Sequence, residues 1–231
     1  MRRTTFGLMT IVLATGPAPL VPSAVSAQGT VSGRVSIRER DEEASKDLAT
    51  AVIYLATAGG GNAGSRPADA EIAMHDKEYI PHVRVVPAGS TVAFPNQDPF
   101  RHNVFSNSPA GPFDLGLTRR GAAARNTFRR PGAYRIYCNI HSRMSAFVIA
   151  VGTLWFTQPG ADGAFTLAGV PPGRYVLHAW HERGGEISRP IEVGPGGLEE
   201  LAVELDARGW RPTEHKNKFG LDYTASDGER Y

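Results

Sequence analysis

Apolar and polar residues alternate over short stretches of this chain, which is the pattern of strands with one buried face. Residues 28–37, QGTVSGRVSI, place Val31, Val35 and Ile37 on one face, and a second strand, TAVIYLAT, follows a charged turn. Further on, HVRVVPAGSTVAFPN predicts two strands joined at residues 87–89, and HNVFS predicts another short strand. We find no long stretch with helical periodicity, and the 26 glycines and 17 prolines supply the turns that many short strands need.

The second half of the chain continues the same pattern. Pro131 and Gly132 suit the centre of a type II turn, and the strand after them, which ends in YRIYC, brings Cys138 onto its apolar face. The stretches SAFVIAVG, GAFTLAGVPPGRYVLHAWH, RPIEVG and LEELAVELDA predict further strands, although the last could be helical by propensity. From Gly209 onward no clear period is visible, and residues 208–231 are expected to be irregular. The sequence therefore predicts an all-β protein.

The first residues predict export. Arg2 and Arg3 precede a short apolar run, FGLMTIVLAT, and Val25 and Ala27 occupy the small-residue positions of a cleavage site. These features indicate a signal peptide over residues 1–27, with the general and the twin-arginine export routes both open. The apolar run is too short to span a bilayer. We therefore expect a periplasmic or secreted protein without a membrane span.

Charge disfavours one class of partner. Lys and Arg number 25 and Asp and Glu number 23 in the whole chain. Removal of residues 1–27 takes away two arginines and no acid, so the mature chain is formally neutral. A general polyanion binder is basic overall, and nucleic acid is therefore not an expected partner.

Cys138 is the only cysteine, so it cannot form a disulfide within one chain. It is a buried inert residue, an intermolecular link or a metal ligand. Cys138, His141 and Met144 follow a predicted strand with the spacing C-x-x-H-x-x-M, and one short loop can turn three such side chains toward one point. Thiolate, imidazole and thioether together favour copper, whereas a thioether is a poor zinc ligand.

A blue-copper site needs a second histidine. Of the seven histidines, His102 is the natural choice, because it stands at a predicted strand edge 36 residues before the cysteine. His178 and His181 lie three apart on a predicted strand and should face opposite sides, which disfavours a second metal there. Two others are expected on the surface, His75 and His82.

The stretch 71–152 resembles the cupredoxins, the family of plastocyanin, pseudoazurin and amicyanin. FPNQDPFRHNV is similar to the family's asparagine–aspartate–histidine segment, and YCNIHSRM is similar to its ligand loop. The resemblance implies a Greek-key β-sandwich with one type 1 copper per chain, bound by His102, Cys138, His141 and Met144. It also implies that Asn103, beside the first ligand, hydrogen-bonds toward the ligand loop. Asn139 departs from the family, in which Ser or Thr more often follows the cysteine.

The residues on either side, 28–57 and 153–207, resemble the two halves of a carboxypeptidase-regulatory or transthyretin-like β-sandwich. The glycine-rich stretch 58–70, AGGGNAGSRPADA, has no large apolar residue and predicts a linker. On this interpretation the cupredoxin is inserted in, or joined to, a second small sandwich. Strands at 30–37 and 50–56 should then pair with strands between residues 164 and 205. The whole arrangement resembles secreted plastocyanin-like proteins labelled methylamine utilisation proteins.

The resemblance implies a one-electron carrier that cycles between Cu(I) and Cu(II) and is not an enzyme. Its redox partner is expected to dock where His141 reaches the surface within an apolar collar of Pro99, Phe100, Pro112, Phe113 and Ala146. A cluster of arginines offers a second contact for an acidic partner: Arg119, Arg120, Arg125, Arg129 and Arg130.

Two other functions stay open. The first is a non-redox copper-binding or adhesive module, in which the flanking sandwich binds a glycan or a protein partner. The second is a copper enzyme such as a nitrite reductase or a multicopper oxidase. Such an enzyme needs further histidine clusters for a catalytic copper, and the remaining histidines are scattered along the chain.

Overall fold

The computed structural model describes residues 28–40, 45–59, 64–212 and 215–223. The expected signal peptide lies outside these residues and stays a prediction. The described elements are strands, apart from one 3₁₀ turn at Leu48–Thr50, so the prediction of an all-β fold is confirmed. LEELAVELDA forms a strand, because its alternating apolar residues bury one face. No helix among the described residues could span a membrane.

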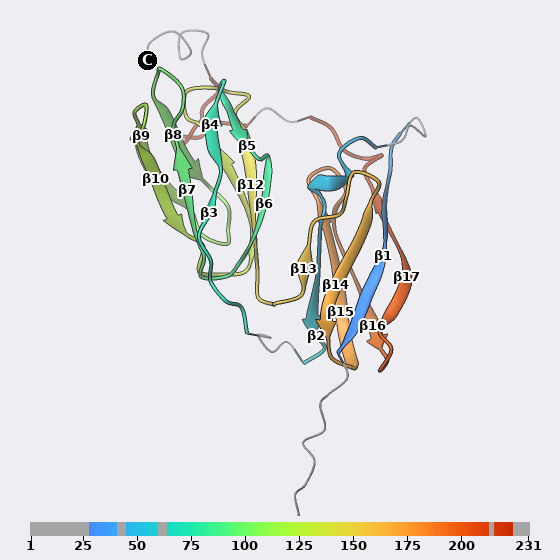
Figure 1. Cartoon of the computed structure of the whole chain (residues 1–231). Helices are drawn as coiled ribbons and strands as arrows, with labels where there is room; N and C mark the ends of the chain where they lie inside the picture. The colour runs from blue at the N-terminus through green and yellow to red at the C-terminus, as the bar shows by residue number, and fades with distance from the viewer. Residues whose placement is uncertain (1–27, 41–44, 60–63, 213–214, 224–231) are drawn as a thin grey trace, which may run out of the picture.

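Strands β3 to β12 form one unit, here called the central sandwich (Figure 1). One sheet has the strand order β10-β7-β3, a second has the order β6-β12-β11-β8-β9, and β4 and β5 form a hairpin. Large apolar side chains such as Phe94, Ile136 and Val148 build its core. The strands are β3 Ala70–Glu71, β4 Ala73–His75, β5 Glu78–Ile80, β6 Val83–Pro87, β7 Thr91–Pro95, β8 His102–Ser106, β9 Phe113–Thr118, β10 Ala123–Thr127, β11 Gly132–Tyr137 and β12 Ser145–Val151.

The remaining strands form a second unit beside it, the flanking sandwich (Figure 1). Its two sheets have the orders β14-β1-β17 and β13-β2-β15-β16. A separate apolar core includes Val35, Leu55 and Leu177. The strands are β1 Gly29–Arg38, β2 Val52–Thr57, β13 Phe156–Thr157, β14 Ala164–Val170, β15 Gly173–His181, β16 Gly185–Val193 and β17 Leu198–Asp206.

Strands from early and late in the chain pair within the flanking sandwich. β1 pairs antiparallel with β14 and parallel with β17, and β2 pairs antiparallel with β15. The chain therefore leaves this sandwich after β2, builds the central sandwich and returns at β13. Gly33 interrupts the alternation of β1, because a Cβ atom there would lie 2.1 Å from the carbonyl oxygen of Leu201. The family of the flanking sandwich and the limits of the domains stay predictions.

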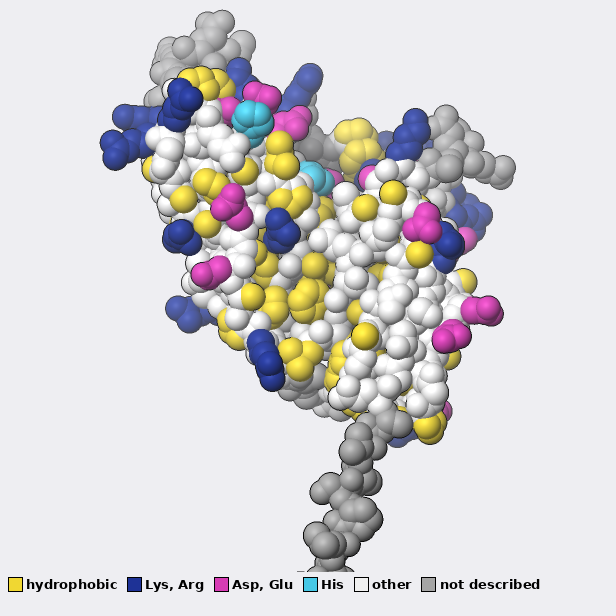
Figure 2. Space-filling view, in the orientation of Figure 1, with side chains coloured by type: hydrophobic (Ala, Val, Ile, Leu, Met, Phe, Trp, Pro, Cys, Tyr) yellow, Lys and Arg dark blue, Asp and Glu magenta, His cyan; other side chains and the backbone are white. Residues whose placement is uncertain are grey.

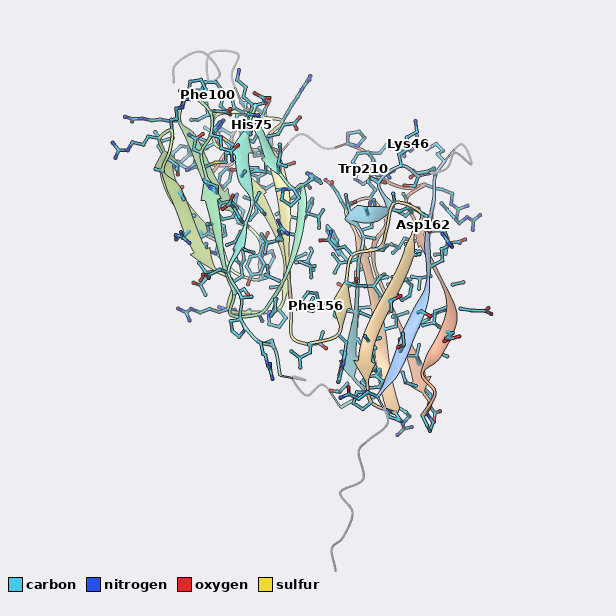
Figure 3. The ribbon with its side chains drawn as sticks, viewed as in Figure 1. Lys46, His75, Phe100, Phe156, Asp162 and Trp210 are labelled. Atoms are coloured by element: carbon cyan, nitrogen blue, oxygen red, sulfur yellow. The ribbon has the colours of Figure 1, made fainter. Side chains whose placement is uncertain are left out.

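The two sandwiches meet through an apolar cluster. The ring of Phe147 on β12 lies 5.0 Å from the ring of Trp180 on β15, and Val52 and Val83 are buried in the same cluster. Figure 2 shows hydrophobic side chains along the boundary between the two units, and Figure 3 places Phe156 there. The contact between the sandwiches is therefore partly a hydrophobic interface.

A polar network borders this cluster. Glu182, which follows β15, bonds Nε2 of His82 at 2.6 Å and the guanidinium of Arg135 at 3.4 Å. Nδ1 of His82 contacts the carbonyl oxygen of Ser145 at 3.1 Å. Because Ser145 directly follows Met144, the network links the flanking sandwich to the end of the predicted ligand loop. His82, expected on the surface, is 40% exposed and engaged on both ring nitrogens.

Candidate metal centre

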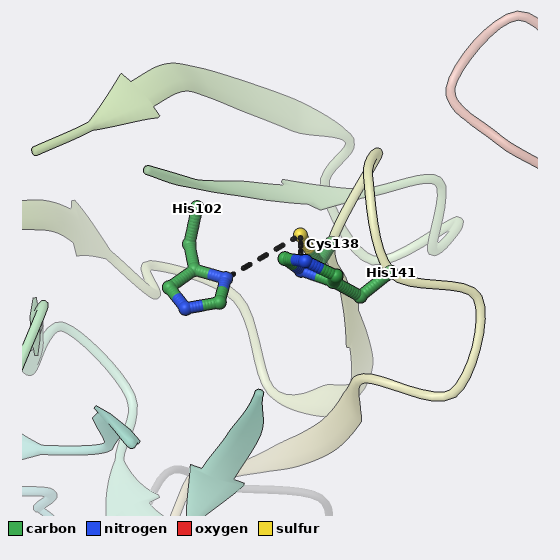
Figure 4. A group of neighbouring side chains, drawn as sticks. All are labelled: His102, Cys138 and His141. Carbon is green, nitrogen blue, oxygen red and sulfur yellow. Dashed lines mark hydrogen bonds between the residues drawn. The ribbon is translucent and has the colours of Figure 1, made fainter. Parts of the chain in front are cut away.

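Three predicted ligands meet at one end of the central sandwich. His102 is the first residue of β8, Cys138 follows β11, and His141 lies in the loop between β11 and β12. Sγ of Cys138 lies 4.0 Å from Nδ1 of His102 and 3.6 Å from Nδ1 of His141 (Figure 4). One possible ligand atom of each residue lies within 4.8 Å of the other two.

The loop that carries Cys138 and His141 is closed by its own backbone. Cys138 continues the buried face that Tyr134 and Ile136 form on β11, as the alternation predicts. The N–H of Cys138 donates to the carbonyl of Met144 at 3.2 Å, and the N–H of Met144 donates to the carbonyl of His141 at 3.1 Å. Met144 is 1% exposed and belongs to the same apolar cluster as Cys138. The spacing of the motif thus curls the loop back on itself.

Asp98 orients the ring of His102. Its carboxylate lies 2.7 Å from Nε2 of His102, and it accepts hydrogen bonds from the N–H groups of Asp76 at 2.8 Å and Lys77 at 3.0 Å. Nε2 therefore carries the proton, and Nδ1 keeps its lone pair toward Cys138. Burial would raise the pKa of Asp98, but these hydrogen bonds outweigh it and lower that pKa.

Electrostatics leave both imidazoles neutral. Burial lowers the pKa of His102. Burial also lowers the pKa of His141, to about 4, and the repulsion that Lys77 and a protonated His102 would exert acts in the same direction. Burial raises the pKa of the Cys138 thiol, against the opposite effect of three backbone N–H groups, those of Asn103, Ile140 and His141. A bound metal cation would favour the thiolate, because it supplies the missing positive charge.

The distances from the sulfur of Cys138 to the two imidazoles suit residues that would hold a metal ion together. Metal–nitrogen and metal–sulfur bonds of about 2.0 and 2.3 Å, set at 120°, put nitrogen and sulfur roughly 3.7 Å apart. The two observed separations are 3.6 and 4.0 Å. Two imidazoles, one thiolate and a nearby buried thioether are the donors that suit copper.

Asn103 and Asn139 make different contacts from each other. The side-chain nitrogen of Asn103 donates to Asp114 at 2.8 Å and to the carbonyl of Gly116 at 2.9 Å, both on β9. The contact of Asn103 with the ligand loop comes from its backbone N–H, which faces the sulfur of Cys138. Oδ1 of Asn139 accepts a hydrogen bond from the backbone N–H of Lys218 at 2.8 Å, a contact that sequence reasoning missed.

The other described histidines lie outside this group. His178 stacks on Tyr54 with ring centres 4.5 Å apart, whereas His181 is fully buried and contacts Thr50 at 3.1 Å. His75 comes near two carboxylates, and this group of three is the other arrangement among the described residues that could hold a metal. The two carboxylates are those of Asp76 and Asp98. His75 and Asp76 are exposed, and Asp98 already accepts a hydrogen bond from His102.

The expected apolar collar is wrong in part. Phe100 does lie beside the site, with its ring 5.2 Å from that of His102 and 5.7 Å from that of His141. Phe113 pairs with Ser106, at the end of β8 away from His102, and packs against Phe128. Ala146 is fully buried and cannot form part of a surface. The alternation of β9 and β12 turns both side chains inward, whereas the partly exposed ring of Phe100 lies beside both imidazoles.

Comparison with known proteins gives matches among solved structures alone. No family model matches the chain, and no curated protein matches it. A Cu-containing nitrite reductase from Thermus scotoductus is 29% identical with a TM-score of 0.35, over 37% of this chain and 23% of that one. A purple cupredoxin from Nitrosopumilus maritimus is 24% identical with a TM-score of 0.33, over 36% of this chain and all of that one. Amicyanin from Paracoccus versutus is 21% identical with a TM-score of 0.34, over 42% of this chain and 98% of that one.

Proposed function

We propose that this chain is a type 1 copper protein of the cupredoxin kind and that it carries single electrons. The observation that supports the proposal best is the approach of two imidazole Nδ1 atoms to the sulfur of Cys138, at 3.6 and 4.0 Å. Met144, buried in the same cluster, completes the proposed ligand set as a weak axial donor. One copper ion per chain would supply the one-electron couple between Cu(I) and Cu(II).

The residues of the chain have separate tasks in this proposal. Cys138, His102 and His141 hold the metal, and Asp98 keeps Nδ1 of His102 directed at it. The closed backbone of the loop would limit how far these side chains move when the copper changes oxidation state. His141 is partly exposed beside Phe100, which supports it as the ligand through which electrons reach a redox partner. A periplasmic or secreted location, after cleavage near Ala27, belongs to the same proposal.

Absorption of the copper-loaded protein tests the site. The protein with Cu(II) is expected to be blue or green from thiolate-to-copper charge transfer, at one copper per chain. Cys138→Ser is expected to lose the colour entirely, because an alcohol does not replace the thiolate at neutral pH. A Cys138→Ser protein that keeps the colour would refute the ligand assignment.

Electrochemistry separates electron transfer from its alternatives. An electron carrier is expected to give a reversible one-electron wave on an electrode, whereas a non-redox copper-binding module gives none in the accessible range. An oxidase or a nitrite reductase would need a second, histidine-bound copper. Metal analysis that found two coppers per chain would favour an enzyme over the carrier proposed here.

A further inference from the structure

Residues 215–223 lie against the predicted ligand loop, although they follow the last strand of the flanking sandwich. They contact residues at the end of β11 in the central sandwich, beside the candidate metal centre, whereas β17 belongs to the flanking sandwich. The sequence, which has no clear period here, predicts only an irregular segment. We call residues 215–223 the strap.

The strap contacts three successive residues where the ligand loop begins. The ring of His215 stacks on that of Tyr137, with ring centres 4.0 Å apart and planes 29° apart. The hydroxyl of Tyr223 donates to the carbonyl of Cys138 at 2.6 Å. The backbone N–H of Lys218 donates to Oδ1 of Asn139 at 2.8 Å. The paired register of β11 and β12 ends at Tyr137, so the hydroxyl of Tyr223 gives the carbonyl of Cys138 a partner beyond the sheet.

The strap also reaches the segment that carries the other histidine. The ammonium group of Lys218 lies 2.7 Å from one carboxylate oxygen of Asp114, and the other oxygen accepts from the side chain of Asn103 at 2.8 Å. Asn103 directly follows His102. Two lines of contact thus join the strap to both ligand-bearing segments, one through Asn139 and Cys138 and one through Asp114.

The strap has a defined structure of its own. Oδ1 of Asn217 accepts hydrogen bonds from the N–H groups of Phe219 at 3.0 Å and Leu221 at 3.1 Å. The N–H of Asn217 donates to the carbonyl of Leu221 at 2.8 Å. Gly220 has a φ of +77°, a conformation that favours glycine and lets the chain turn back. A segment braced in this way can hold its neighbours.

We propose that the strap positions the ligand loop, with Tyr223 as the positioning residue for Cys138. This inference rests on the proposed copper site for its functional meaning, because a fixed Cys138 carbonyl limits how far the thiolate can move when the oxidation state changes. It also accounts for Asn139, whose side chain serves as the acceptor for the strap. Hydrogen bonds from residues outside the ligand set hold a metal site in its geometry better than the ligand loop does by itself.

Hydrogen exchange of the metal-free protein tests the strap independently of copper. Tyr223→Phe keeps the ring and removes the hydroxyl, which donates to the carbonyl of Cys138 at 2.6 Å and also contacts Nδ1 of His215 at 3.2 Å. Amides of residues 138–144 are expected to exchange roughly fivefold faster, the factor for one lost hydrogen bond of ordinary strength. A chain that ends at Pro212 is expected to exchange faster still. Tyr175→Phe is the matched control, because the Tyr175 hydroxyl donates to the carbonyl of Pro171 at 2.8 Å in the flanking sandwich.

Copper-loaded protein gives the second readout. In Tyr223→Phe and in the shortened chain, the thiolate-to-copper band is expected to shift or change in relative intensity, and transfer of copper to a chelator is expected to quicken. Tyr175→Phe is expected to match the wild type in both. If loop exchange and spectra stay at wild-type values in both Tyr223→Phe and the shortened chain, the proposed positioning role of the strap is refuted. A wild-type protein that binds no copper would instead overturn the proposed function, while the exchange measurement still tests the strap.

Discussion

The carboxylate of Asp98 accepts a hydrogen bond from Nε2 of His102 at 2.7 Å, and both side chains are almost completely buried, with 4% and 0% exposed. A buried carboxylate behind an imidazole fixes its tautomer and raises its basicity as a metal ligand. It also sets a negative charge close to the proposed copper. Asp98 is therefore the residue outside the ligand set that should act most directly on the copper potential.

Asp98→Asn is expected to raise the reduction potential. Cu(II) gains more than Cu(I) from a nearby negative charge, so loss of that charge disfavours the oxidised state. The blue or green colour should remain, because the four ligands remain. The midpoint potential on an electrode measures the effect. Asp76→Asn is the control: its side chain is 84% exposed and makes no contact with His102 among those described. Equal shifts in the two variants would mean that net charge, and not this hydrogen bond, sets the potential.

Met144→Leu is expected to keep copper and colour and to raise the reduction potential. A weak thioether donor favours Cu(II), and leucine supplies similar volume without the donor. Met74→Leu is the matched control, since Met74 is equally buried in the core of the same sandwich but outside the ligand loop. Loss of copper from Met144→Leu would contradict the role of a weak axial ligand. An equal shift in Met74→Leu would point to a general packing effect.

Local sequence pattern predicts the strands and most of the site. Strand alternation puts Cys138 on a buried face, and the three proposed ligands Cys138, His141 and Met144 share one short loop, so their approach to one another depends on few residues. His102 could be proposed because strand ends near each other in a sandwich gather side chains at one edge. The observed geometry brings His102, Cys138 and His141 within ligand distance of one another.

Contacts between residues far apart in the sequence cannot be predicted from local pattern. Tyr223 and Cys138 are 85 residues apart, and nothing in an aperiodic segment indicates which surface it covers. Asp98 stands four residues before His102, a spacing whose meaning depends on how the intervening loop bends. The resemblance to cupredoxins puts Phe113 in the expected apolar collar of His141. Its position on β9 instead pairs it with Ser106 and packs its ring against Phe128.

The ion pair between His82 and Glu182 should make stability depend on pH. The carboxylate of Glu182 raises the pKa of His82, against the opposing effects of burial and the charge of Arg135. A raised pKa means that the contribution to stability is fully present below the unfolded value of about 6.5. It is lost as pH rises through the higher folded pKa.

His82→Gln should therefore destabilise the protein most at low pH. The loss in the free energy of unfolding is expected to reach up to about 1 kcal/mol near pH 5.5, the range for a partly exposed ion pair, and to shrink near pH 8.5. Urea denaturation at the two pH values measures it. His75→Gln serves as the control. His75 lies at the turn of the hairpin β4–β5, at the end away from His82, and contacts Asp76 at 3.4 Å. A loss that stays constant with pH would assign the effect to the contact with Ser145 and not to charge.

The five arginines expected to form one patch are divided by a strand. Arg119 and Arg120 lie in the turn before β10, where the N–H of Gly121 donates to the carbonyl of Asn96. The side chain of Asn96 in turn donates to the carbonyl of Phe100, beside the candidate metal centre. Arg129 and Arg130 follow β10 at its other end, beside Phe128. All four are exposed. A strand rises about 3.4 Å per residue, so the two pairs lie farther apart than one Debye length of about 8 Å at physiological salt.

Electron transfer with an anionic reagent should therefore depend mainly on the first pair, Arg119 and Arg120. Oxidation of the Cu(I) protein by hexacyanoferrate(III), followed by stopped flow, is expected to slow as salt rises. Replacement of Arg119 and Arg120 by Ser should slow it at low salt by on the order of tenfold, because steering acts on the association rate. The matched change of Arg129 and Arg130 to Ser removes the same charge from the far end and should alter the rate much less. A cationic cobalt oxidant should show the opposite salt dependence. Equal effects of the two pairs would mean that net charge alone governs the rate, and flat kinetics in both would make these arginines ordinary solvated surface.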